Sequence, residues 1–265
     1  MEVPVANSSS GESVIHRAVR ILSVFGPRAQ SRGLREIARE ADLPVSTVHR
    51  ILNELEVEGL VSRDQSGRWT LGNRLWEIAS RGAEASDLRK AALPPMEDVV
   101  QALQVHISLS VLDGTDALYV ERLAPDEFVV NITEVAGRLP AHACSAGLML
   151  TAFGPTEQQE LMLRRRLEKL TENTITDPHE LRALFARIRE QGYAAMEGII
   201  VAESSGISVP VYGRGGEVIA ALTVIRHRGQ EDLNVIVPQL RFASRATSRR
   251  LGVVLDSHRV RRLMG

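Results

Sequence analysis

The sequence predicts an α+β protein of two domains, in which a winged helix-turn-helix is followed by a connecting helix and a larger domain. Three observations lead to this prediction. Within residues 13–73, three segments with apolar residues at helical spacing precede two short strand-like runs. Beyond residue 94, longer strand-like runs alternate with helical segments, which is typical of one sheet with helices beside it. A length of 265 residues with 44% hydrophobic side chains suffices for two cores.

The first domain is expected between residues 13 and 73, after a polar, serine-rich tail at residues 1–12 that we expect to be disordered. Its first helix lies in SVIHRAVRILSVFG, capped by Ser13, with an apolar stripe formed by Val14, Ala18, Ile21, Leu22 and Phe25. LREIAREA predicts a second helix. The third runs from about Val45 to Glu58, with Val48, Ile51, Leu52 and Leu55 facing inward. LVSR and RWTLG then form a hairpin around DQSG.

Residues 74–93 are interpreted as a connecting helix, and residues 94–265 as the larger domain. In that domain a helix is expected to begin at Pro94, followed by strands in VHISLSVL, ALYVERL and FVVNITEV. Helices are expected in CSAGLMLTAFG, TEQQELMLRRRLEKL and DPHELRALFARIREQG, and strands in GISVPVYG and EVIAALTVIR. A final helix within residues 234–263 closes a domain large enough to enclose a ligand.

Charge and cysteine content exclude several classes of protein. The net charge of −1 argues against a protein that coats nucleic acid through bulk charge, although residues 14–82 carry 11 arginines against 8 acidic groups. The single cysteine excludes an intramolecular disulfide framework and a multi-cysteine metal site. The sequence has neither a signal peptide nor an apolar run long enough to span a membrane. We therefore expect a cytoplasmic protein without cofactor, metal or membrane partner.

The outward face of the third predicted helix is rich in small hydrogen-bond donors and cations. In a winged helix-turn-helix this helix lies in the DNA major groove, so its outward side chains must donate to phosphates and base edges. Ser46 and Thr47 are placed for phosphates beside the helix dipole, and Arg50 for a guanine edge. The residues that we expect to contact double-stranded DNA are Val45, Ser46, Thr47, His49 and Arg50 on this helix, and Arg63 and Arg68 on the wing.

Ordinary structural roles are open to the same residues. Ser46 and Thr47 can be N-caps, and an exposed helical histidine is usually a solvated bystander. Arg50 can form a surface ion pair with Glu54, and Arg68 can form one as well. A helix-turn-helix can also serve as a protein interface, but the basic face favours DNA, whose binding must weaken steeply with salt.

Several segments resemble one known family, namely SVIHRAVRILSVFG, LREIAREADLPVSTVHRILNELEVEGLVSRDQSGRWTLG, GRLPAHACSAG, RIREQGYA, SVPVY and GEVIAALTV. The family is the isocitrate-lyase-regulator (IclR) family of bacterial transcription factors, and the resemblance covers nearly the whole chain from about Ser13. It implies a winged helix-turn-helix, a linker helix and a GAF-like effector domain, acting as a homodimer or a dimer of dimers on a palindromic operator. It also implies that a small molecule, often an organic or aromatic acid, changes operator binding.

The effector half departs from the family pattern. Two positions that line the ligand site in the family, commonly Asp and a small polar residue or Cys, are Met196 and Gly206 here. Leu148 stands where Lys or Arg usually follows HACSAG. A pocket that has lost polar groups and gained Met and Ile should favour a larger, more apolar ligand. Tight binding of a small hydrophilic acid such as pyruvate, measured by calorimetry, would contradict this.

The matching positions lie at the loop and helix start of GRLPAHACSAG. Backbone N–H groups at that helix start attract an anion, and Arg138 or His142 can add charge. Ser208 points its hydroxyl to the same region if Ile207 faces away. The residues that we expect around the effector are Arg138, Leu139, His142, Cys144, Ser145, Ala146, Met196, Gly206 and Ser208.

Cys144 and His142 allow other interpretations. His142 can be a satisfied structural histidine, and Cys144 a small buried hydrophobe. A redox-responsive regulator acting through Cys144 needs a partner thiol or a small oxidant. A Cys/His enzyme is disfavoured because residues two apart at a helix start seldom face each other, and no oxyanion motif is evident. The effector, the operator and the direction of regulation are left open by the sequence.

Overall fold

The computed structural model describes residues 12–26, 30–81, 83–125 and 135–253. The chain divides into two compact units, Met1–Ala83 and Glu84–Gly265. Among the described residues no helix is both long and apolar enough to cross a membrane. The expected tail apart from Glu12, the strand FVVNITEV apart from its last residue, and the end of the expected last helix lie outside the described residues.

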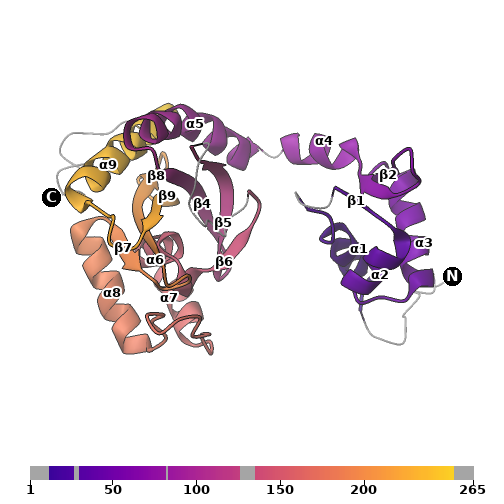
Figure 1. Cartoon of the computed structure of the whole chain (residues 1–265), viewed down its shortest axis with the longest axis horizontal. Coiled ribbons are helices and arrows are strands. Elements are labelled where there is room, and N and C mark those ends of the chain that lie inside the picture. Colours follow the sequence, from indigo (N-terminus) through magenta and orange to yellow (C-terminus); the bar gives the residue numbers. More distant parts are fainter. Residues whose placement is uncertain (1–11, 27–29, 82, 126–134, 254–265) are drawn as a thin grey trace. The chain divides into compact units, whose positions relative to one another are not determined.

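The first unit has the predicted winged helix-turn-helix fold (Figure 1). Its elements are α1 (Val14–Leu22), β1 (Ser31–Arg32), α2 (Leu34–Glu40), α3 (Val45–Val57), β2 (Val61–Arg63), β3 (Trp69–Leu71) and α4 (Asn73–Arg81). The three strands form an antiparallel sheet in the order β1-β3-β2. The three helices and the two wing strands confirm the sequence prediction, whereas β1 was not predicted, because two residues carry no periodic signal.

The core of this unit is built from one face of each helix and the base of the wing. Ile21, Ile37, Leu52 and Trp69 are almost completely buried in it. The prediction that Val14 faces inward is wrong, since its side chain is 40% exposed. The first turn of α1 extends beyond the core, so the apolar stripe packs against the core only from the second turn onward.

An arginine joins α1 to the turn between α2 and α3. Asp42 in this turn has a φ of +49°, a left-handed conformation that a non-glycine residue adopts only when its surroundings support it. Arg20 donates a hydrogen bond to the Asp42 carbonyl at 2.9 Å and another to the carbonyl of Ala41. This arginine therefore fixes the turn that sets the angle of α3.

The second unit is an α+β domain built on one antiparallel sheet, as predicted. Its elements are α5 (Ala83–Leu103), β4 (His106–Asp113), β5 (Asp116–Leu123), β6 (Arg138–Pro140), a 3-10 turn at Ala141–Ala143, α6 (Ser145–Phe153), α7 (Thr156–Leu163), α8 (Pro178–Gln191), β7 (Ala194–Glu197), β8 (Ser204–Tyr212), β9 (Val218–His227) and α9 (Leu233–Arg250). The six strands lie in the order β6-β5-β4-β9-β8-β7. Helices cover both faces of the curled sheet (Figure 1).

Each face of the sheet has its own core. On one face α5 and α9 pack against the strands, with Met96, Leu109 and Leu240 completely buried. On the other face α6 and α8 do so, with Leu148 and Phe185 at the centre. Successive residues of a strand therefore alternate between two buried environments.

Two predicted helix boundaries are wrong. No helix begins at Pro94, because α5 begins at Ala83 and continues through two prolines, which leave two backbone carbonyls of the helix without their usual N–H donors. The helix predicted in TEQQELMLRRRLEKL ends at Leu163, where three successive arginines offer no apolar face for a further turn. The last helix, expected within residues 234–263, begins at Leu233 and ends at Arg250.

Candidate functional site

The third helix of the first unit presents a polar face, as the sequence predicted. Val48, Ile51, Leu52 and Leu55 are buried against the core. The side chains on the opposite face are exposed, or half-buried in the case of Thr47, namely Val45, Ser46, Thr47, His49 and Arg50. The five helix residues expected at DNA therefore share one accessible surface.

Neither hydroxyl at the start of α3 acts as a helix cap. The N-cap residue is Pro44, and the helix has no side-chain cap. Ser46 and Thr47 occupy the second and third helical positions, where the first backbone N–H groups have no intrahelical acceptor. The N-terminus of α3 thus offers hydroxyls, N–H groups and the positive end of the helix dipole together, which is a favourable surface for a phosphate.

The arginines of this surface form ion pairs, as the alternative interpretation expected. Arg50 donates to Glu54 at 2.7 Å, one turn further along α3, and both side chains are more than half exposed. Arg63 lies over the Trp69 ring, 4.1 Å from its centroid, and 3.4 Å from a Glu56 oxygen. Exposed pairs of this kind are weak and exchange readily for a stronger anion such as phosphate.

Arg68 lies in the turn of the wing, but its side chain is directed toward α2. Its guanidinium donates to Glu36 at 2.7 Å and to the Ser31 carbonyl at 3.3 Å, so the side chain folds back onto the start of α2. The cause is the acidic residue at the third position of α2, which also accepts from the backbone of Gly33. The ion pair is the alternative that the sequence analysis gave for this residue, and a contact between Arg68 and DNA stays a prediction.

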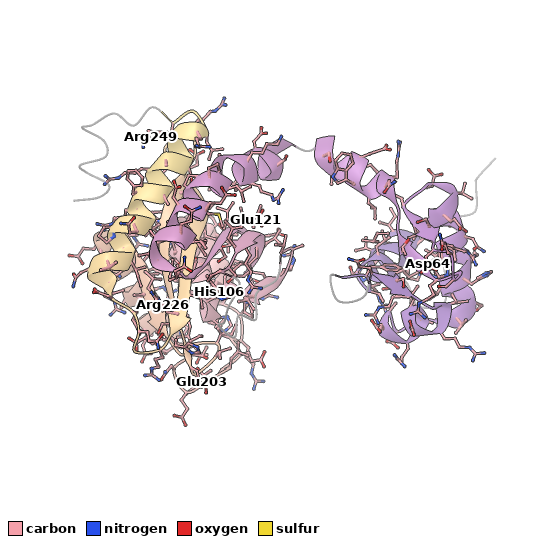
Figure 2. The ribbon with its side chains drawn as sticks, turned by 45° about the horizontal axis from the view of Figure 1, so that its top comes forward. Asp64, His106, Glu121, Glu203, Arg226 and Arg249 are labelled. Carbon is pink, nitrogen blue, oxygen red and sulfur yellow. The ribbon has the colours of Figure 1, made fainter. Side chains whose placement is uncertain are left out.

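The wing turn is held by Asp64, a residue that the sequence analysis missed (Figure 2). Its Oδ1 accepts hydrogen bonds from the Ser66 hydroxyl at 2.6 Å, the Ser66 backbone at 2.8 Å and the Arg68 backbone at 3.0 Å. These hydrogen bonds, that of the Ser66 hydroxyl first, lower the pKa of Asp64. An Asp three residues before a turn glycine is the signal that could have identified it.

The second unit contains a cavity between the start of α6 and strands β5, β7, β8 and β9. Its own volume is about 40 Å³, and about 480 Å³ is free of protein atoms when the space open to solvent is included. The residues that line it are Tyr119, Leu139, Cys144, Ser145, Met196, Ile199, Ile200, Val201, Ser204, Ser205, Gly206, Thr223 and Ile225. None of these described residues carries a charge, and the wall is mainly apolar.

Five of the nine residues expected around an effector line this cavity, namely Leu139, Cys144, Ser145, Met196 and Gly206. Ala146 is buried in the neighbouring core. Arg138 is half exposed and pairs with Asp113, and the His142 ring lies 2.9 Å from the Glu168 carbonyl. Neither of these two groups adds charge to the cavity, so that expectation is wrong. His142 instead has the other role that the sequence analysis considered, that of a structural histidine with its hydrogen bond satisfied.

A chain of buried hydroxyls forms the polar end of the cavity. Ser208 donates to the Ser145 hydroxyl at 2.9 Å and lies 2.8 Å from the Thr223 hydroxyl. Ile207 packs into the opposite core, so the predicted alternation along this strand is confirmed. Gly206 makes room for the arrangement, because a Cβ there would lie 2.5 Å from the Ser145 oxygen.

The thiol of Cys144 is buried and caps α6. It accepts a hydrogen bond from the Gly147 backbone at 3.4 Å and lines the cavity together with Tyr119. Burial raises its pKa to about 11, and burial likewise raises the pKa of Tyr119 far above its usual value. A protonated, enclosed thiol is a poor nucleophile, so the geometry disfavours both redox sensing and covalent catalysis.

The residues missed at the cavity are those whose role depends on sheet register. Tyr119, Thr223 and Ile225 reach it from β5 and β9, strands far from α6 in the sequence. The pairing of Ser208 with Thr223 across β8 and β9 brings the hydroxyls together. No group of His, Cys, Asp or Glu among the described residues is arranged to hold a metal ion.

A winged helix-turn-helix with an accessible polar α3, joined to an α+β domain with a largely apolar cavity, defines the class of ligand-sensing DNA-binding proteins. Family models agree with this architecture. Residues 14–65 match the IclR helix-turn-helix domain, and residues 81–249 match the bacterial transcriptional regulator IclR C-terminal domain. The chain therefore belongs to the IclR family of bacterial transcriptional regulators.

Individual relatives support the assignment. An HTH-type transcriptional regulator of Mycobacterium tuberculosis is 34% identical over 236 residues, which cover 81% of this chain and 90% of that protein. The regulator KipR of Bacillus subtilis is 28% identical over 240 residues, covering 89% of this chain and 96% of the relative. A crystal structure of an IclR homolog from Microbacterium hydrocarbonoxydans, complexed with 4-hydroxybenzoate, is 40% identical with a TM-score of 0.84, covering 91% of this chain and 99% of that one.

Proposed function

We propose that this chain is a cytoplasmic transcriptional regulator in which residues 13–73 bind a palindromic DNA operator and residues 94–265 bind a small-molecule effector. The observation that carries the first half is the exposed face of α3, with Ser46, His49 and Arg50 opposite a fully buried apolar face. In the bound state Arg50 exchanges Glu54 for a base edge, while Ser46 and Thr47 contact a phosphate.

The cavity supports an effector of aromatic or apolar character with one polar end. Met196, Ile199 and Ile225 offer an apolar wall, while Ser145 and Thr223 offer hydroxyls at one end. A phenol or a carboxylate can hydrogen-bond to these hydroxyls and to the N-terminus of α6. The 4-hydroxybenzoate carried by the 40% identical homolog has this chemistry, so it is the first compound to test.

Dimerisation is proposed to involve the apolar side chains exposed on the first unit. On α1, Ile15 is 77% exposed and Val19 is 55% exposed, and on α4, Trp76 is 73% exposed. A second copy of the chain would remove these side chains from water and supply the second recognition helix for a palindrome. Sedimentation of Ile15→Glu beside Arg187→Ala, an exposed change on α8, tests this: only the first should dissociate the assembly.

The decisive experiment is a fluorescence-anisotropy titration of the full chain against the intergenic DNA upstream of its own gene, at low and moderate salt. We expect binding that weakens steeply with salt and resists competitor DNA. Arg50→Ala should abolish specific binding, whereas Arg187→Ala should leave it unchanged. Equal, competitor-sensitive binding by both variants would contradict the role of α3.

Coupling between effector and operator is proposed to run through α4 and the first part of α5. If these helices can pack in two ways, a ligand that binds the cavity more tightly in one of them shifts the protein toward that packing. The spacing of the two recognition helices then changes, and with it the affinity for both half-sites. Titration of 4-hydroxybenzoate into the operator complex measures this coupling as a change in operator affinity. A fall in operator affinity would mean that the effector releases the protein from DNA, and a rise would mean that the effector strengthens its binding to DNA.

A further inference from the structure

A β-bulge in β5 separates two side chains that a regular strand would place on the same face. Ser110 of β4 pairs with Tyr119, but the next residue of β4, Leu109, pairs with Glu121, so Val120 is an extra residue. Alternate residues of a regular strand share a face, whereas a bulge breaks that rule locally. Tyr119 and Glu121 consequently face opposite sides of the sheet.

On one side, Tyr119 belongs to the cavity. It lines the wall together with Cys144, the cap of α6. Its ring is buried in the core beneath α6. Any ligand that fills the cavity must therefore contact or displace this side chain.

On the other side, Glu121 belongs to the interface with α5. Its carboxylate is 6% exposed and forms an ion pair with Arg89 of α5, and it also accepts from the Arg122 backbone at 2.9 Å. Figure 2 shows Glu121 beside the α5 ribbon. A carboxylate this buried is costly to leave without its cation, so its position constrains Arg89.

A second hydrogen bond joins the sheet to the opposite end of α5. Arg226 of β9 donates to the carbonyl of Leu103, the last residue of the helix, at 3.2 Å. Because α5 begins at Ala83, where the sequence passes from the first unit to the second, Arg89 holds the N-terminal part of this helix. The Arg226 contact anchors the far end, so a shift at Arg89 alters the start of the helix.

We infer that Tyr119, the bulge at Val120 and the Glu121–Arg89 ion pair connect the cavity to the start of α5. A change at Tyr119 shifts the bulge, which lacks one ladder partner and therefore moves at lower cost than a regular strand. The ion pair passes that shift to the first turns of α5. This inference deepens the proposed function, since it identifies the positioning residues by which the effector site acts on the connecting helix.

Hydrogen–deuterium exchange of the full chain tests the connection without ligand or DNA. Tyr119→Phe keeps the ring but removes the hydroxyl, and is introduced into wild type, Glu121→Gln, Arg89→Ala and Lys90→Ala. We expect it to change exchange of the amides at residues 86–93 by about threefold or more in wild type, the scale on which loss of one buried hydroxyl changes local stability. The change should fall below about 1.5-fold in Glu121→Gln and Arg89→Ala.

Lys90→Ala is the matched control, because Lys90 is an exposed cation on the same helix that lies 3.9 Å from Asp87 and not at the sheet. It should respond to Tyr119→Phe as wild type does. An equal response in all four backgrounds, or none in wild type, overturns the inference. Since no DNA is present, failure of operator binding would count against the proposed function and leave this comparison unaffected.

Discussion

At the residue scale, Cys144 shows how burial decides the chemistry of a side chain. A thiol with a pKa of about 11 is protonated near neutral pH, and its sulfur is enclosed by α6 and Tyr119. We expect the folded protein to react with a thiol-specific disulfide reagent at least about a hundredfold more slowly than the unfolded chain. The colour released by the reagent, with and without denaturant, measures both rates. Rapid reaction of the folded protein would restore the redox alternative.

The same pKa makes stability depend on alkaline pH. The thiol loses its proton near pH 9 in the unfolded chain but only near pH 11 in the folded one. Its contribution is complete below pH 9 and is lost as the pH rises through 11, because over this window the unfolded state alone gives up the proton. Chemical denaturation of wild type and Cys144→Ala across this range should show a steeper loss of unfolding free energy in wild type. Parallel curves would argue that the thiol is hydrated.

Gly206 controls the space at the polar end of the cavity. In Gly206→Ala the added Cβ would lie 2.5 Å from the buried Ser145 oxygen, so Ser145 must move away from Ser208. We expect a loss of about 1–3 kcal/mol in unfolding free energy and weaker 4-hydroxybenzoate binding by calorimetry. Gly26→Ala, where nothing lies within 4 Å, is the control. Unchanged stability and affinity would show that the hydroxyl chain adjusts freely.

At the scale of elements, the charge balance of α3 limits its affinity for DNA. Arg50 is held by Glu54 in the free chain, and Glu54 also places a negative charge on the outward face. Glu54→Gln should strengthen operator binding by about threefold to tenfold at low salt, with a smaller gain at higher salt. Anisotropy titrations at two salt concentrations measure this. Weaker binding by Glu54→Gln would mean that Glu54 positions Arg50 in the complex.

The elements differ in how far the sequence predicted them. The apolar spacing of α3 identified all four of its buried residues, because a helix face depends only on local order. Thr223 could not be placed at the cavity, since its position depends on the register between β8 and β9. The pairing of Arg68 with Glu36 could not be predicted, because these two residues are distant in sequence. Pro94 suggested a helix start, yet packing against the sheet keeps α5 continuous through it.

At the scale of the whole molecule, the proposed operator affinity depends on two linked half-sites. A fragment of residues 1–82 keeps the first unit and its α3 but lacks the second unit. We expect it to retain the sequence preference of the full chain while losing most of the affinity, about a hundredfold or more, because each copy then binds a half-site independently. Titration of both proteins on the same DNA compares them. Equal affinities would contradict a mechanism based on spacing.

The positions of the two tryptophans give the molecule an optical asymmetry. Trp69 is buried beneath Arg63 and Trp76 is exposed on α4, and the sequence contains no other tryptophan. The unit that contains the cavity therefore has no indole of its own. Fluorescence excited selectively at the indole band therefore comes only from the wing and α4. If a compound that does not absorb at these wavelengths binds in the cavity and changes this fluorescence, its binding has altered the first unit, on the other side of residue 83 in the sequence.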